Sequence, residues 1–147
     1  MVKIIRYLDP RLITFLDIAN QTEALETLVD LVDRSGRLPD KGSFLQAVFE
    51  REKLVSTGIG MGVALPHAKQ SSFRDFFIAI GILKKGIDWQ ALDDAPVRII
   101  FLIGGPADKQ TEYLQLLSSL TTAIENEEKR KMLLQADNAE KVLELFE

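Results

Sequence analysis

Between residues 56 and 67 the chain reads Ser56-Thr57-Gly58-Ile59-Gly60-Met61-Gly62-Val63-Ala64-Leu65-Pro66-His67, a glycine-rich loop followed by a short apolar strand. The glycines Gly58, Gly60 and Gly62 allow the backbone to turn so that successive N–H groups point into one concavity, which holds an anion without side-chain charge. Pro66 fixes its own φ and biases the preceding residue towards an extended conformation, so the ring of His67 stands on a stiff support. A neutral imidazole is a good nucleophile near pH 7 because its unperturbed pKa is about 6.5. This arrangement is typical of a site for chemistry on a phosphoryl group.

Two better-known phosphate-binding patterns do not fit this stretch. No Gly-Lys-Ser/Thr follows the loop at the spacing of a P-loop. The dinucleotide-binding fingerprint is incomplete, because Gly58 and Gly60 match it but Val63 stands where its third glycine belongs. Nucleotide binding is therefore disfavoured. If only the sequence of the loop is considered, His67 can also be interpreted as a hydrogen-bonded structural residue.

The composition is that of one folded domain. The chain has 147 residues, 46% of them hydrophobic, and a formal net charge of −4, which gives no net attraction to nucleic acid or to an anionic membrane. It has no cysteine and one histidine, which excludes a disulfide framework and a metal site with thiolate or several histidine ligands. We therefore expect no metal and no cofactor. The N-terminus lacks the apolar run of a signal peptide and no apolar stretch is long enough to span a membrane, which predicts a cytoplasmic protein without membrane insertion.

Strand and helix patterns alternate along the chain. Residues 13–18, 63–65, 76–82 and 97–103 are predicted strands, and the last two are almost entirely apolar, which fits strands buried on both faces. Residues 86–89 are expected to form a short returning piece. Asn20 and Asp40 stand where they can cap helices, Asp108 starts a third helix, and two short helices end the chain, the last opened by Asp137.

This order of elements predicts the fold class. We expect an α/β protein of a single domain, residues 1–147, with a mixed parallel and antiparallel central sheet and helices on both faces. Ligand sites in such folds lie at the carboxyl ends of strands, where His67 and the loop at Gly104 and Gly105 are both expected.

Other residues around the glycine-rich loop can bind a phosphoryl group. Arg51 continues the apolar stripe of the helix capped by Asp40, an unusual place for a solvated charge. It either folds towards the loop and offers its guanidinium to phosphoryl oxygens, or extends to water and contacts the last carbonyls of the helix. Ser56 and Thr57 either donate hydroxyl hydrogen bonds to phosphate or to the imidazole, or only shape the turn. Lys69 lies just past the histidine, and we expect it to be solvated.

Several segments together resemble one known family. They are Arg51-Glu52, Ser56-Thr57-Gly58-Ile59-Gly60 and Gly62-Val63-Ala64-Leu65-Pro66-His67, with further matches at Ala24-Leu25…Leu28, Pro96…Phe101-Leu102 and Pro106-Ala107…Leu114…Leu117. This set is similar to the signature of the fructose/mannitol-type (type 2) enzyme IIA domain of the phosphoenolpyruvate-dependent sugar phosphotransferase system. Stand-alone relatives of that domain include the nitrogen-regulatory enzyme IIA proteins. The resemblance covers nearly the whole chain and implies one such domain over residues 1–147.

The resemblance also implies roles for single residues. His67 matches the histidine that takes a phosphoryl group from the phosphohistidine of the carrier protein HPr and passes it on, usually to an enzyme IIB domain. We expect Nε2 of this ring to attack and Nδ1 to be oriented by a backbone hydrogen bond. The family has an arginine at the position of Arg51, which favours its contact with the phosphoryl oxygens. The expected phosphate-binding residues are those of the loop, Ser56, Thr57, Gly58, Gly60 and Gly62.

One position departs from the family pattern. Many members have a second histidine, adjoining the acceptor, where this chain has Tyr113. A tyrosine keeps a hydroxyl donor but cannot become a cation. Tyr113 also shares a helix face with Leu116 and Leu120, so the alternative is that it only caps the core.

Three functions are compatible with these residues. The first is a phosphocarrier, in which phosphorylation of His67 serves transfer or acts as a regulatory switch by adding charge to a partner-binding surface. Such a protein is a phosphotransferase component rather than a stand-alone metabolic enzyme. The second is a binding module that docks a target protein through the same surface without transfer, which Tyr113 favours. The third, an unrelated enzyme with His67 as general base, lacks a nucleophile or carboxylate partner at motif spacing.

Overall fold

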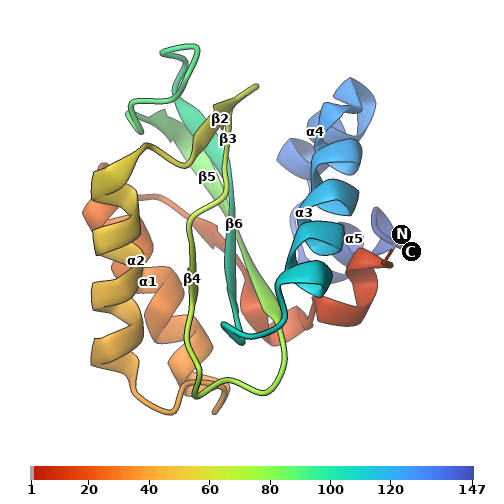
Figure 1. Ribbon diagram of the computed structural model, residues 1–147. Helices are drawn as coiled ribbons and strands as arrows, with labels where there is room; N and C mark the ends of the chain where they lie inside the picture. Colours follow the sequence, from red (N-terminus) through yellow and green to blue (C-terminus); the bar gives the residue numbers. More distant parts are fainter. Residues whose placement is uncertain (1) are drawn as a thin grey trace.

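The computed structural model contains a six-stranded sheet with helices on both faces (Figure 1) and describes residues 2–147. Among the helices of this range, none combines the length and the apolar character needed to cross a bilayer. The strands are β1 (Ile13–Leu16), β2 (Gly58–Gly60), β3 (Val63–Ala64), β4 (His67–Lys69), β5 (Phe77–Ile87) and β6 (Val97–Gly105). The helices are α1 (Gln21–Arg34), α2 (Lys41–Leu54), α3 (Gln110–Glu125), α4 (Glu127–Gln135) and α5 (Ala139–Glu144), and two 3-10 turns, η1 (Ile4–Tyr7) and η2 (Pro10–Leu12), precede β1.

The sheet mixes parallel and antiparallel pairs. Its strand order is β1-β5-β6-β3-β2, and β4 also pairs with β6. β1 is parallel to β5, β5 is antiparallel to β6, β3 and β4 are both parallel to β6, and β2 is antiparallel to β3. The predicted α/β fold with a mixed sheet is therefore confirmed. β3 and β4 form one line along β6, interrupted by Leu65 and Pro66.

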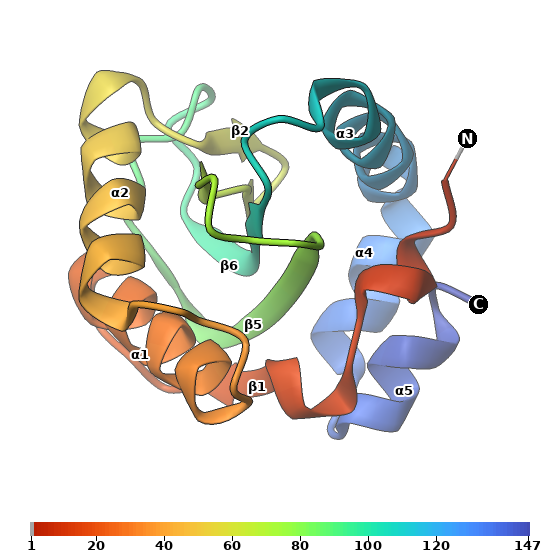
Figure 2. The ribbon, with the colours of Figure 1, turned by 60° about the horizontal axis from the view of Figure 1, so that its bottom comes forward.

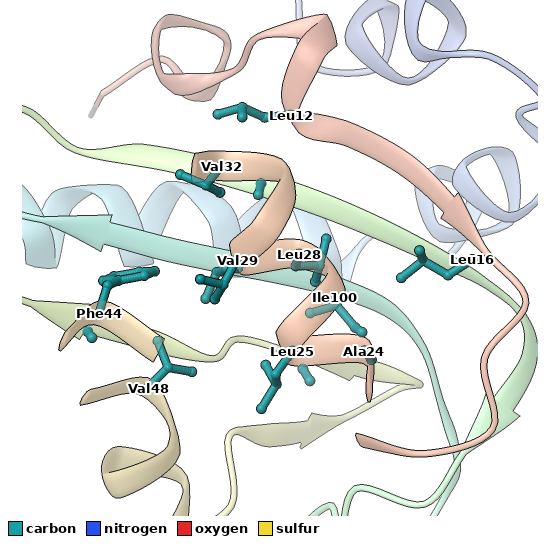
Figure 3. Packing of buried hydrophobic residues seen from close by; sticks show 14 of the residues in the cluster. Leu12, Leu16, Ala24, Leu25, Leu28, Val29, Val32, Phe44, Val48 and Ile100 are labelled. Carbon is teal, nitrogen blue, oxygen red and sulfur yellow. The ribbon is translucent and has the colours of Figure 1, made fainter. Parts of the chain in front are cut away.

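Two hydrophobic cores lie on opposite faces of this sheet. α1 and α2 cover one face, and α3, α4 and α5 cover the other (Figure 2). Neighbouring residues of β5 and β6 point into different cores: Ala79 and Ile100 face α1 and α2, whereas Ile80 and Phe101 face the other helices. Both strands are thus buried on both faces, as their apolar sequence predicts. Figure 3 shows part of the α1–α2 core, including Leu12, Leu16, Ala24, Leu25, Leu28, Val29, Val32, Phe44, Val48 and Ile100.

The predicted helix starts at Asn20 and Asp40 are confirmed. The side chains of Asn20 and Asp40 accept hydrogen bonds from the backbone N–H of the third residue of α1 and α2, which satisfies donors left unpaired at a helix start. The prediction that Asp137 opens the last helix is wrong, because the side chain of Asn138 caps α5. α3 begins two residues after the predicted start at Asp108.

Strand β5 is longer than its apolar core suggests. It continues through Ile87, so the separate piece predicted for residues 86–89 is wrong; an irregular register after Ile82 keeps the strand paired with β6. Gly104 and Gly105, predicted to lie in a closing loop, are the last residues of β6 and pair with β4. They make room for aromatic rings, since a Cβ on Gly105 would lie 2.0 Å from Cδ1 of Phe76.

Candidate functional site

His67 is the first residue of β4, which lies between α2 and α3 in Figure 1. It is aligned with Ile103 of β6, whose backbone N–H donates a hydrogen bond of 2.9 Å to the carbonyl of Pro66. Side chains alternate along a strand, so Ala68 points into the α1–α2 core while His67 and Lys69 face α3. The sheet therefore holds the backbone on both sides of the histidine.

The imidazole of His67 is oriented by one backbone contact. Its Nδ1 lies 3.0 Å from the carbonyl oxygen of Leu65. A carbonyl only accepts hydrogen bonds, so Nδ1 carries the proton and the lone pair belongs to Nε2. This is the orientation expected from the sequence.

The half-buried position of His67 favours the neutral form of its ring. Burial lowers the pKa of His67 below its usual value, and the positive charges of Arg51 and Lys69 lower it further. The hydrogen bond to the Leu65 carbonyl and the carboxylate of Glu52 oppose this shift. The net decrease in pKa favours the neutral, nucleophilic form near pH 7.

Arg51 lies in the last turn of α2 and faces the site. Its Nη1 donates a hydrogen bond of 2.9 Å to the carbonyl of Val55, the residue that ends the helix. Its charge also lowers the pKa of both His67 and Tyr113. The contact with a helix-end carbonyl is therefore present, and the contact with phosphoryl oxygens stays a prediction.

The hydroxyls of Ser56 and Thr57 are engaged within the protein. Ser56 Oγ donates to the carbonyl of Trp89 at 2.7 Å and accepts a bond from the N–H of Gly58 at 3.1 Å. The hydroxyl of Thr57, which is buried, donates to Glu52. These contacts favour the interpretation that both residues shape the turn before β2.

A network centred on Glu52 joins the end of α2 to this turn. One carboxylate oxygen accepts a bond of 2.8 Å from the N–H of Thr57, and the other accepts from the Thr57 hydroxyl and from Nε1 of Trp89 at 3.2 Å. Trp89 is 1% exposed, and its Nε1 also lies 3.1 Å from the Thr57 hydroxyl oxygen. The network fixes the segment between Arg51 and the strands that lead to His67. Sequence reasoning did not identify Trp89, because it lies 32 residues from Thr57 and reaches it only through the fold.

The structure does not bring all the loop glycines to His67. Gly60 and Gly62 have φ values of +97° and +75° and form the turn of the β2–β3 hairpin, where positive φ favours glycine. Gly60 is aligned with Val63, which pairs with Ile99, four residues before the partner of His67 on β6. At about 3.3 Å per residue, the hairpin turn lies roughly 13 Å along the sheet from His67.

This distance argues against the expected phosphate-binding role of Gly60 and Gly62, whose conformations serve the hairpin instead. Gly58 pairs with Ala64, which is nearer to His67 along the sheet than the hairpin turn is. A Cβ on Gly58 would lie 2.8 Å from the Cβ of Ala91. Its small size allows this close packing.

Tyr113, in the first turn of α3, contacts both the core and the histidine. The ring centroids of Tyr113 and His67 are 5.7 Å apart, and Phe76 stacks on Tyr113 at 6.0 Å. The tyrosine is 5% exposed, and burial raises the pKa of its hydroxyl. Position 113, where the resemblance implies a second histidine in many members of the family, therefore adjoins the imidazole in this chain.

Lys69 is more constrained than its expected solvated state. Its Nζ lies 4.2 Å from the centroid of the Tyr113 ring and donates a hydrogen bond of 2.5 Å to Oε1 of Gln110. In the part of the chain that the structure describes, no three histidine, cysteine, aspartate or glutamate side chains gather as metal ligands. The imidazole thus lies where the positive charges of Arg51, on α2, and Lys69, on β4, both act on it.

Comparisons with known proteins concern the family and the fold of the chain. The family profile described as "Phosphoenolpyruvate-dependent sugar phosphotransferase system, EIIA 2" matches residues 6–147. The PTS system fructose-specific EIIA component of Haloferax volcanii is 35% identical over 128 residues, which are 87% of this chain and 83% of that protein. The PTS system fructose-specific EIIABC component of Bacillus subtilis is 35% identical over 122 residues, which are 83% of this chain but 19% of that protein, so the chain spans about a fifth of this relative. The crystal structure of nitrogen regulatory protein IIA-Ntr from Neisseria meningitidis superposes with a TM-score of 0.91 and 27% identity, covering 98% of this chain and 99% of the other.

Proposed function

This chain belongs to the EIIA 2 family of the phosphoenolpyruvate-dependent sugar phosphotransferase system, and on that premise we propose that it is a phosphocarrier that accepts a phosphoryl group on His67 from phosphorylated HPr. The observation that carries the proposal is the state of the imidazole. Its Nδ1 proton is held by the Leu65 carbonyl, and its lowered pKa favours the neutral ring with a lone pair on Nε2.

In the proposed transfer, the Nε2 lone pair of His67 forms a bond to phosphorus while the P–N bond of the donor phosphohistidine breaks. The electron pair of that bond returns to the donor imidazole. The proton on Nδ1 stays in place, so the His67 ring becomes cationic as it binds the phosphoryl group. The surrounding residues then contribute positioning and charge rather than covalent chemistry.

Arg51 is the residue that we propose for the phosphoryl oxygens. A guanidinium has five N–H donors, and the bond to Val55 uses one of them. The charge of Arg51 already acts on His67 in the free protein, which supports its placement at the site. A planar guanidinium suits the paired oxygens of a phosphoryl group.

The recipient of the phosphoryl group is an enzyme IIB domain or a regulated target protein. The likeness to the nitrogen regulatory protein of Neisseria meningitidis supports the regulatory version, and the likeness to the fructose-specific component of Haloferax volcanii supports sugar transport. In the regulatory version, phosphorylation adds about −1.5 to −2 charges to the docking surface and changes its affinity. Both versions imply a cytoplasmic protein.

A second candidate function is a docking module that binds its target without transfer. The observation that favours it is Tyr113, which adjoins His67 but cannot become a cation as a second histidine can. In this version His67 stays unphosphorylated while the surface around it binds the target.

Incubation with phosphoenolpyruvate, enzyme I and HPr, followed by intact-mass analysis, separates the two functions. We expect the wild-type chain to gain one acid-labile phosphoryl group and the His67→Ala variant to gain none. No gain with partners from the same organism, while a target protein still binds, favours the docking module.

A further inference from the structure

Lys69 stands out as a charged residue that the proposed function leaves unexplained. It lies two residues beyond His67 on β4, and side chains two apart on a strand project from the same face. Both side chains contact the ring of Tyr113, His67 at 5.7 Å between centroids and Lys69 with Nζ at 4.2 Å from the centroid. An aromatic ring and a neighbouring side chain thus hold one ammonium group next to the imidazole.

Two contacts reduce the freedom of this ammonium group. The face of the Tyr113 ring attracts the cation, and Oε1 of Gln110 accepts one of its hydrogen bonds at 2.5 Å. An ammonium has three N–H donors, so two remain for another acceptor. A solvated lysine side chain loses conformational entropy when it becomes ordered. The side chain of Lys69 is already ordered in the free protein by these two contacts.

From this geometry we propose that Lys69 is a phosphoryl-binding residue, whose ammonium group, held by Tyr113 and Gln110, supplies positive charge beside His67. The proposal rests on the proposed function of His67. The phosphoryl group on Nε2 of His67 accepts hydrogen bonds from Lys69 on the α3 side and from Arg51 on the α2 side. Tyr113 acts as a positioning residue, because its ring holds the ammonium and it does not itself carry charge.

The charge of Lys69 is felt at His67 in the free protein, since it contributes to the lowered pKa of the imidazole. Of the carboxylates near the site, Glu52 accepts hydrogen bonds from Thr57 and Trp89. Glu112, beside Tyr113 in sequence, accepts a bond of 2.9 Å from the hydroxyl of Tyr7. The ammonium of Lys69 therefore has a neutral amide, not a carboxylate, as its hydrogen-bond acceptor, and its charge is available to an anion.

The test uses two phosphoryl donors on the full chain: phosphorylated HPr and the small molecule phosphoramidate, which needs no protein docking. Labelling of His67 is followed by intact mass for wild type, Lys69→Met, Lys69→Arg and the control Lys85→Met, an exposed lysine of β5. We expect Lys69→Met to slow labelling by both donors about tenfold or more, since it removes a charge-assisted hydrogen bond. Lys69→Arg restores most of the rate, and Lys85→Met matches wild type.

The outcomes separate this proposal from the function on which it rests. Equal rates for Lys69→Met and Lys85→Met with phosphoramidate overturn the role of Lys69 but leave the phosphocarrier intact. A third outcome is that phosphoramidate labels His67 at a rate that depends on Lys69, while phosphorylated HPr does not label it. This result supports the role of Lys69 and overturns HPr as the donor. Failure of both donors to label wild-type His67 overturns both proposals. If Lys69→Met does not fold, Lys69→Gln, which keeps a polar side chain on this half-buried strand, takes its place.

Discussion

Replacing Glu52 with glutamine tests whether the network at the end of α2 holds the site in place. The carboxylate accepts hydrogen bonds from the N–H and the hydroxyl of Thr57 and from Nε1 of Trp89. A glutamine has the same shape but keeps one accepting oxygen, and its NH₂ group would face a donor. The substitution therefore removes one hydrogen bond to a charged acceptor. It also leaves the NH₂ group of the glutamine facing a donor of Thr57 or Trp89.

The expected loss of stability follows from this count. A hydrogen bond to a charged group contributes about 1.5–3 kcal/mol, so we expect Glu52→Gln to lower the free energy of unfolding by about 2 kcal/mol. For a chain of this length, that loss lowers Tm by roughly 4–8 °C. The His67 pKa should also decrease, because the Glu52 carboxylate raises it in the wild-type protein.

Thermal unfolding followed by circular dichroism measures the first effect, with Glu50→Gln as a matched control on the same helix. The imidazole C–H signals in an NMR pH titration measure the second, and they are unambiguous because His67 is the only histidine. A Tm within about 1 °C of the control would refute the view that the network stabilises the fold, since the lost bond alone predicts a larger shift. An unchanged His67 pKa would refute the electrostatic link between Glu52 and the imidazole.

Three further predictions concern the same site and one helix. Tyr113→His should slow hydrolysis of phosphorylated His67, because a second imidazole can become a cation beside the phosphoryl group; identical rates in a mass-spectrometric time course would remove position 113 from the site. The pKa of His67 is lowered on folding, so its contribution to stability is present above about pH 6.5 and is lost as the pH falls through the folded pKa. Urea unfolding at two pH values should therefore show that wild type loses more stability on acidification than His67→Asn, and equal losses would contradict the lowered pKa. Asn138→Ala should lower the free energy of unfolding by about 1 kcal/mol through loss of the helix cap, more than Asp137→Ala does, as measured by urea unfolding; the opposite order would restore Asp137 as the cap.

Much of the fold could be predicted because local signals and tertiary packing agree. Asn20 and Asp40 cap helices where their sequence context predicts it, and the apolar runs of β5 and β6 are buried on both faces. Where two local signals compete, sequence alone does not decide. Asp137 and Asn138 are both good caps, and the backbone of the native turn selects Asn138.

The short strands around the site were harder to predict. β2 and β4 have three residues each and owe their conformation to pairing with β3 and β6, which the local sequence does not show. The glycine pattern does not distinguish an anion-binding loop from a tight hairpin, because both need positive φ. Only the register with β6 shows that Gly60 and Gly62 lie far from His67.

The residues of the candidate site differ in how visible they are in the sequence. His67 was evident as a lone histidine after a proline, and its Nδ1 contact with a backbone carbonyl was expected. The contact between Trp89 and Glu52 and the contact between Lys69 and Tyr113 are not evident in the sequence, because each joins residues more than 30 positions apart. Such partners become visible only when the chain is folded.

Under the proposed regulatory function, the placement of His67 on a paired strand has a consequence for how a target protein recognises the phosphorylated state. A phosphoryl group attached to a mobile loop can change the shape of a surface, but here the backbone on both sides of the acceptor is bonded to β6. A target protein that distinguishes the phosphorylated from the unphosphorylated chain must then respond mainly to the added charge. Salt screens such a charge over about 8 Å at physiological ionic strength. Discrimination between phosphorylated and free protein should therefore weaken as ionic strength rises, while the apolar part of the binding affinity persists.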